Sequence, residues 1–93
     1  MQIQLFATYR DLVNAKVVDI PVPDLLTVKQ LLQSLINHYP DFQDELFVDK
    51  TQEQLKPHVN IFVNGRNIIY LHGLDTLIST KDEIALFPPV GGG

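Results

Sequence analysis

The sequence contains no cysteine and no tryptophan among its 93 residues. Without cysteine, the chain has no disulfide bond, no thiolate metal ligand and no cysteine nucleophile. Any sulfur or acyl chemistry must therefore use another group. One candidate is the carboxylate of the last residue of the sequence, Gly93.

Positive charge and long apolar runs are also scarce. Seven Lys and Arg residues stand against eleven Asp and Glu residues, which gives a formal net charge of −4. This balance disfavours nucleic acid and anionic membranes as partners. No apolar run approaches the ~18 residues of a membrane span, and the N-terminal residues lack the charged and then apolar order of a signal peptide. We therefore expect a cytoplasmic protein that binds neither nucleic acid nor membrane.

The length and composition fit a single small domain, with 45% apolar and 19% charged residues. A chain of this size buries roughly 60–65% of the surface that its unfolded form exposes. The sequence ends in three glycines, Gly91 to Gly93, after the stiff pair Pro88-Pro89. We predict a domain over residues 1–89 and a flexible tail over residues 90–93.

Period-two alternation predicts two strands near the N-terminus. In residues 2–8, Ile3, Leu5 and Ala7 alternate with side chains of the other face and should point into the core. Residues 17–22 form the second predicted strand, and Pro21 favours an edge position because proline lacks the backbone donor. The two segments together predict a hairpin.

The second half of the sequence predicts three further strands. Residues 59–63 run into Asn64-Gly65, which both accept positive φ and indicate a tight hairpin turn, with residues 66–70 returning as a short strand. The last strand is predicted over residues 83–87, with Ile84 and Leu86 facing the core and Pro88-Pro89 ending it.

One helix is strongly marked. Thr27 and Gln30 form a capping box at its start, and Pro40 ends it. Its apolar residues recur at the spacing of one helix face: Val28, Leu31, Leu32, Leu35, Ile36 and Tyr39. Between this helix and residue 56, Phe42 and Leu46 share one side of a predicted helical turn.

The order of these elements predicts an α+β fold, in which a mixed sheet of four to five strands carries one main helix on one face. Phe6, Phe62 and Phe87 each fall on the side of their strand opposite the aliphatic positions. They are predicted to share the uncovered face as a docking patch. The alternative is that loops cover them or that a bulge shifts the alternation.

The histidine and serine residues do not form a recognisable metal-binding or catalytic motif. His38, His58 and His72 lack a ligand spacing, so we predict no metal site. Ser34 and Ser79 have no evident base partner. No stably bound cofactor is expected.

The chain as a whole resembles the ubiquitin-like β-grasp sulfur carriers of the MoaD/ThiS type, and within them most resembles the small subunit of molybdopterin synthase. The likeness covers nearly all of the sequence and rests on an ordered series of motifs: Phe6-Ala7 with Arg10, Thr27-Val28, Val59 to Gly65, Leu74-Asp75-Thr76, Asp82-Glu83-Ile84, and Phe87-Pro88-Pro89-Val90 before Gly-Gly.

This resemblance implies a role for the tail. An E1-like adenylyltransferase would use ATP to activate the carboxylate of Gly93 as an acyl adenylate, and a sulfur donor would convert the adenylate to a thiocarboxylate. Gly91 and Gly92 would let the tail enter a narrow channel, because glycine has no Cβ. The chain would be a cosubstrate and non-catalytic subunit, with catalysis in the large subunit of a heterotetrameric molybdopterin synthase.

The resemblance also implies a partner-binding surface formed by Phe6, Phe62 and Phe87 with Arg10, and with Pro88 and Pro89 at the base of the tail. Arg10 would form an ion pair with an acidic residue of the partner. The alternatives are an ion pair with an acidic residue of its own chain, or exposure to solvent without a partner. Two related functions stay open: a sulfur carrier for cysteine or thiamine-type biosynthesis, and a ubiquitin-like modifier conjugated to lysines. A plain binding module with an inert tail is the alternative from a different class.

Overall fold

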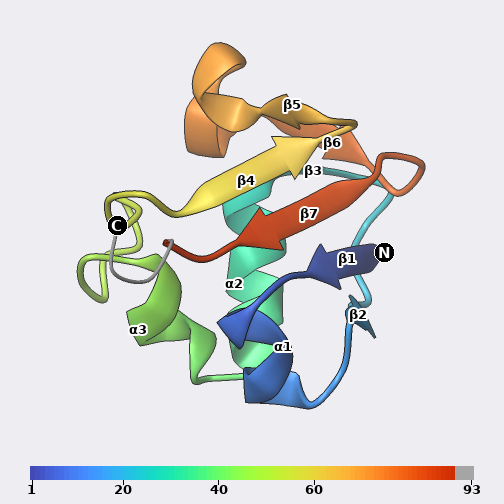
Figure 1. Ribbon diagram of the computed structural model, residues 1–93. Helices are drawn as coiled ribbons and strands as arrows, with labels where there is room; N and C mark the ends of the chain where they lie inside the picture. Colours follow the sequence, from blue (N-terminus) through green and yellow to red (C-terminus); the bar gives the residue numbers. More distant parts are fainter. Residues whose placement is uncertain (90–93) are drawn as a thin grey trace.

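The computed structural model of the chain describes residues 1–89 (Figure 1). The predicted tail of residues 90–93, with Gly91, Gly92 and Gly93, lies outside the described residues. The elements in chain order are β1 (Gln2–Leu5), α1 (Thr8–Val13), β2 (Val17–Asp19), β3 (Leu25–Thr27), α2 (Val28–His38), α3 (Phe42–Leu46), β4 (Asn60–Val63), β5 (Arg66–Asn67), the 3-10 turns η1 (Ile68–Tyr70) and η2 (Gly73–Asp75), β6 (Leu77–Ser79) and β7 (Ile84–Phe87).

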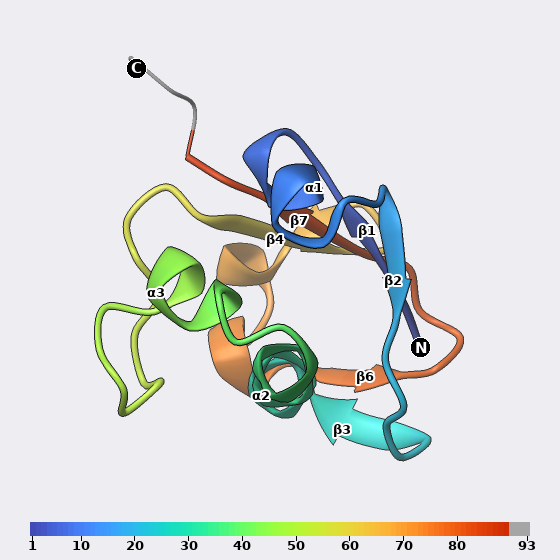
Figure 2. The ribbon, with the colours of Figure 1, turned by 90° about the horizontal axis from the view of Figure 1, so that it is seen from below.

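Five strands form a mixed sheet in the order β2-β1-β7-β4-β5. The first and last strands, β1 and β7, are parallel neighbours at its centre, and the other pairings are antiparallel. Helix α2 lies on one side of this sheet (Figure 2). The predicted α+β fold, with a mixed sheet and one main helix, is therefore confirmed.

The core fills the space between the sheet and α2. Alternate strand residues point toward the helix, and Ile3, Leu5, Ile84 and Leu86 are all buried, as predicted. The other buried apolar residues are Tyr9, Val18, Ile20, Leu26, Val28, Leu31, Leu32, Leu35, Phe42, Leu46, Phe47, Ile61, Val63, Ile68 and Ile78. One helix on one face leaves the opposite face of the sheet open.

Helix α2 begins as predicted. The backbone N–H of Gln30 donates to the Thr27 hydroxyl over 3.1 Å, and the N–H of Thr27 donates to the Gln30 side-chain oxygen over 2.9 Å. These reciprocal bonds satisfy two donors that the first turn of a helix leaves free. The short helix α3 buries Phe42 and Leu46, which confirms the predicted helical turn.

The antiparallel pairing predicted for the N-terminal hairpin is confirmed, and β2 is an edge strand. The strand predicted over residues 17–22 is shorter, because β2 ends at Asp19, and helix α1 between the two strands was not predicted. The inward position predicted for Ala7 is wrong. Strand β1 ends at Leu5, and Ala7 is exposed with φ 50° and ψ −130°. The N–H of Tyr9 donates to the carbonyl of Phe6 over 3.1 Å, so a tight turn starts α1 there.

Two further differences concern the second half of the chain. Asn64 and Gly65 have φ of 52° and 81°, as the turn prediction requires, but β5 covers only 66–67 of the predicted return strand. Strands β3 and β6 pair antiparallel as a separate two-stranded sheet that sequence alternation did not predict. No helix within residues 1–89 combines the length and apolar content needed to cross a membrane.

Candidate functional site on the open face of the sheet

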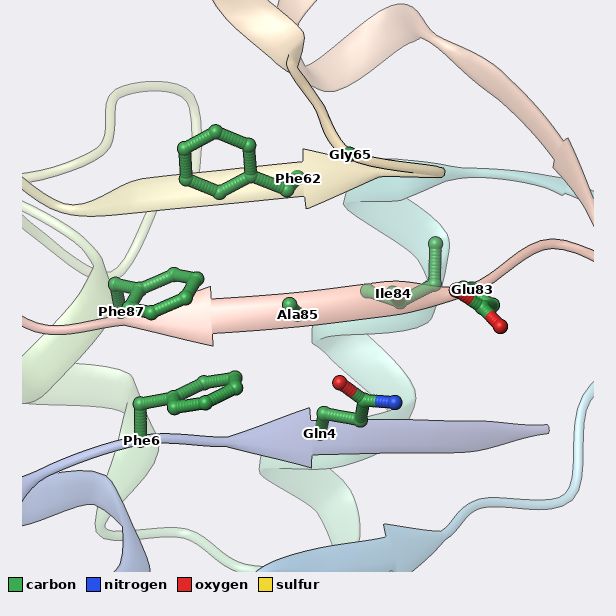
Figure 3. Close-up of a pocket in the computed structure, with 8 residues that line it drawn as sticks. All are labelled: Gln4, Phe6, Phe62, Gly65, Glu83, Ile84, Ala85 and Phe87. Atoms are coloured by element: carbon green, nitrogen blue, oxygen red, sulfur yellow. The ribbon is translucent and has the colours of Figure 1, made fainter.

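Three phenylalanines meet on the face of the sheet that points away from α2 (Figure 3). The rings of Phe6 and Phe87 stack with centroids 4.2 Å apart and planes at 9°. The rings of Phe62 and Phe87 meet edge to face, with centroids 5.3 Å apart. The predicted gathering of these side chains on the uncovered face is therefore confirmed.

The register of the sheet explains why these rings meet. In the parallel pair, Leu5 lies opposite Leu86, so Phe6 and Phe87 are the next neighbours beyond the end of β1. In the antiparallel pair, Phe62 lies opposite Ala85, which places it diagonal to Phe87. Diagonal neighbours on one sheet face are within reach of aromatic side chains. Phe87 is thus the centre of the group, because it contacts both other rings.

A shallow hollow of about 290 Å³ lies beside the three rings. Ala85 forms part of its lining, between Gln4 of β1 and Phe62 of β4 (Figure 3). Because the side chain of Ala85 is a single methyl group, it projects less from the sheet than the aromatic rings do, which leaves the hollow at the middle of β7. The surface can therefore accept a protruding apolar side chain of a partner.

A second hollow, of about 470 Å³, adjoins the end of β7. Phe62 and Phe87 line both hollows, and Pro88 and Pro89 line the second one. The other lining residues are Ala7, Thr8 and Asn60. The base of the predicted tail therefore lies at the aromatic surface, although the strand order alone did not require this.

Arg10 lies in α1 and reaches back over the end of β1. Its Nε donates a hydrogen bond of 2.7 Å to the carbonyl of Leu5, and its guanidinium carbon is 5.0 Å from the centroid of the Phe6 ring. Within residues 1–89, no carboxylate lies within 4.0 Å of this guanidinium. The predicted local ion pair is therefore not seen in this part of the chain, while the pairing with a partner carboxylate stays a prediction.

The two carboxylates whose pKa is shifted do not line the hollows beside the rings. Hydrogen bonds from the Ser79 N–H and the Asn64 side-chain amide lower the pKa of Asp82, and bonds from Thr51 lower the pKa of Asp49. Both arrangements stabilise turns. Among residues 1–89, no group of three or more His, Cys, Asp or Glu side chains could hold a metal ion. Within the described part of the chain, the residues that line the two hollows of the aromatic face are mostly apolar, and Glu83 is the one carboxylate among them.

The predicted site residues Phe6, Arg10, Phe62, Phe87, Pro88 and Pro89 come together at one end of the open face. The lining residues that sequence reasoning did not assign to the site are Gln4, Ala7, Thr8, Asn60, Gly65, Glu83, Ile84 and Ala85. The same alternation that placed the phenylalanines also pointed Gln4 and Ala85 outward, so a signal was present. For Thr8 there was none, because the turn at Ala7 was not predicted.

Residues 3–93 match the family model described as the ThiS family. The chain belongs to the ThiS family. The resemblance to sulfur carriers of the MoaD/ThiS type is thereby confirmed at the level of the family, and the solved structures that are similar to the chain confirm the β-grasp fold. Because the match extends to residue 93, it includes the three glycines that follow the described part of this ThiS-family chain.

Relatives of this ThiS-family chain carry two kinds of name. It is 37% identical over 93 residues to small archaeal modifier protein 3 of Haloferax volcanii, covering 100% of this chain and 98% of that protein. It is 40% identical over 68 residues to a candidate sulfur carrier protein of Archaeoglobus fulgidus, covering 73% of this chain and 75% of the relative.

A solved structure from Pyrococcus furiosus is similar over almost the whole length. It is described as a candidate molybdopterin converting factor, subunit 1, and is 28% identical in sequence. The superposition has a TM-score of 0.73 and covers 96% of this chain and 95% of that one.

Proposed function

We propose that this chain is a sulfur carrier, in which the carboxylate of Gly93 is converted to a thiocarboxylate that supplies sulfur for the dithiolene of molybdopterin. The observation that carries the proposal is the family match that extends to residue 93 and so includes the glycines of the tail. The sulfur-carrier name of the Archaeoglobus relative supports the general role. The Pyrococcus structure and the ending Phe87-Pro88-Pro89-Val90 favour molybdopterin as the recipient.

The proposed chemistry proceeds in two steps. The Gly93 carboxylate attacks the α-phosphate of ATP, which gives an acyl adenylate and releases pyrophosphate. Hydrosulfide from a sulfur donor then attacks the acyl carbon, the bond between the acyl carbon and AMP breaks, and AMP leaves. The product is the thiocarboxylate, which loses the hydrosulfide proton to solvent. An E1-like adenylyltransferase would catalyse the activation, because the described residues of the chain offer no catalytic acid-base pair near the tail base.

The aromatic face has a role in this proposal as the surface that the activating enzyme and the synthase large subunit bind. Phe6, Phe62 and Phe87 are each half-buried, so their rings are partly accessible while the stack holds them in place. Rigid aromatic anchors contribute binding area at low entropic cost. Their position beside Pro88 supports this role, because the docking surface would then adjoin the segment that enters the partner.

Intact mass spectrometry tests the sulfur-carrier proposal directly. The chain is incubated with ATP, a sulfur donor and the cognate adenylyltransferase, and replacement of the terminal oxygen by sulfur adds about 16 Da. Fragment ions should place the addition on Gly93. A variant lacking Gly92 and Gly93 is the control and should stay unmodified. If several verified activating enzymes leave the mass unchanged, the chain is not such a carrier.

Binding of the aromatic face is tested separately by calorimetry. Phe87→Asp should weaken the complexes with the activating enzyme and the large subunit, because it puts a charge into the apolar contact. Tyr70→Asp is the matched control, since Tyr70 is an aromatic residue of η1 with 77% of its surface exposed. Unchanged affinity in a folded Phe87→Asp variant would exclude this face as the docking surface.

A second candidate function is a protein modifier, which the Haloferax relative's name favours. In that case, the activated Gly93 would form an isopeptide bond with the ε-amino group of a lysine on another protein. Mass spectrometry of cell extracts separates the two functions. Lysine peptides that carry the C-terminal residues of the chain support conjugation, whereas sulfur label found in molybdopterin supports sulfur donation.

A further inference from the structure

Three side chains form a continuous series of contacts from α1 to the end of the last strand. The Arg10 guanidinium lies 5.0 Å from the ring centroid of Phe6, and the Phe6 ring stacks on Phe87. The Arg10 Nε is also fixed by its bond to the Leu5 carbonyl. Arg10 is therefore held at two points of the segment that carries Phe6.

These side-chain contacts connect the two chain segments just beyond the point where the backbone pairing of β1 and β7 ends. The last paired residues of β1 and β7 are Leu5 and Leu86, because the turn at Ala7 takes the chain out of the sheet. On the β1 side, the contact made by Phe87 is the stacked ring of Phe6. On the other side, Phe87 still lies opposite Asn60 of β4. On the β1 side, the end of β7 is therefore held by the stacked rings of Phe6 and Phe87 instead of by backbone hydrogen bonds.

We propose that Arg10 is a positioning residue for Pro88 and Pro89, the base of the tail. It holds the Phe6 ring flat against Phe87 and thereby fixes the direction in which Pro88 and Pro89 leave the sheet. The proline rings restrict φ, so an orientation set at Phe87 is retained through Pro88 and Pro89. This inference rests on the proposed function of Gly93. It means that the tail base is oriented toward a partner before binding.

An arginine suits this role better than a lysine. Its guanidinium is planar, so it can lie against an aromatic ring while Nε donates sideways to a carbonyl. A lysine ammonium retains the positive charge but has no Nε donor and no flat surface. Arg10→Lys therefore separates a positioning role from a role in which only the charge of residue 10 contacts a partner.

Nuclear magnetic resonance of the free protein tests the structural part. We expect Arg10→Lys and Arg10→Ala to weaken the cross-relaxation between the rings of Phe6 and Phe87 and to change the residual dipolar coupling of the Pro88 Cα–Hα bond. Arg66→Lys is the matched control, because Arg66 is an exposed arginine in β5. Ring contacts and Pro88 couplings equal to those of the wild type in Arg10→Lys would overturn the proposal.

A double-mutant cycle on the activation reaction tests the functional part. Loss of one cation–π contact should raise the KM for the carrier roughly two- to fivefold in Arg10→Ala, with kcat unchanged, because preorganisation is lost before chemistry. In a Phe6→Leu background, Arg10→Ala should raise KM no further, since the ring through which Arg10 acts is absent. The same factor in both backgrounds would show a direct contact of Arg10 with the enzyme and overturn the proposal.

The resonance measurements and the double-mutant cycle together distinguish a failure of this inference from a failure of the proposed function. If wild-type chain is never adenylated or thiocarboxylated, the proposed function is wrong. The resonance measurements on the free protein still decide whether Arg10 controls the ring stack and the tail base.

Discussion

Replacement of Ala7 by glycine should stabilise the protein. Ala7 has φ 50° and ψ −130°, and the Tyr9 N–H donates to the Phe6 carbonyl across it. This is the turn position at which glycine is favoured, because a Cβ clashes with the backbone when φ is positive. Ala7 is exposed, so the substitution removes no buried apolar contact.

The expected magnitude follows from two opposing terms. Positive φ costs an L-residue roughly 1–2 kcal/mol, and glycine loses roughly 0.5–1 kcal/mol more chain entropy on folding than alanine does. The net gain in the free energy of unfolding is therefore about 0–1.5 kcal/mol, with a central value of about 0.75 kcal/mol. For a domain of this size, the central value corresponds to a rise of roughly 3–6 °C in Tm.

Urea and thermal unfolding measure this gain. Ala15→Gly is the matched control, because Ala15 is also exposed but does not have positive φ, so it should lose stability by roughly 0.5–1 kcal/mol. If Ala7→Gly unfolds at the same or a lower urea midpoint than the wild type, the turn at Ala7 is not strained as described.

Two other predictions concern buried and titrating groups. Tyr9→Phe should leave the free energy of unfolding unchanged or raise it by up to about 1 kcal/mol, because the buried Tyr9 hydroxyl has no hydrogen-bond partner among residues 1–89; a loss well above that size in urea unfolding would indicate a partner such as bound water. The stability of Asp82→Asn relative to the wild type should depend on pH, because hydrogen bonds from Ser79 and Asn64 lower the pKa of Asp82 in the folded protein. The stabilisation by the Asp82 carboxylate is then present above the ordinary pKa of 3.8 and is lost as pH falls through the lowered value, so the wild type should lose its advantage in acid. A stability difference that stays constant from pH 7 to acid would contradict this assignment.

Several features of the chain follow from local sequence. The spacing of apolar residues and the Thr27–Gln30 capping box defined α2, because a helix depends mainly on neighbours within one or two turns. Asn64-Gly65 determined the β4–β5 turn through its tolerance of positive φ. Strand alternation gave the face on which each phenylalanine lies, and the motif series gave the family.

Other features depend on contacts between distant parts of the chain. The parallel pairing of β1 with β7 brings Phe6 beside Phe87, although the two lie at opposite ends of residues 1–89. No periodicity within either strand encodes which strand will be its neighbour. The β3–β6 pairing was missed for the same reason, since each strand has only three residues and too few alternations to be recognised.

The turn at Ala7 shows where local preference and tertiary structure disagree. Alternation continued the first strand through Ala7, and alanine is not a residue that favours positive φ. The structure instead ends β1 at Leu5 and buries Tyr9 of α1 at 0% exposure, while Arg10 bonds back to Leu5. Burial of a large side chain and a charged hydrogen bond together outweigh roughly 1–2 kcal/mol of backbone strain. The sequence by itself thus determined α2, the β4–β5 turn and the face on which the three phenylalanines lie, whereas tertiary packing determined which strands pair and which of these side chains meet.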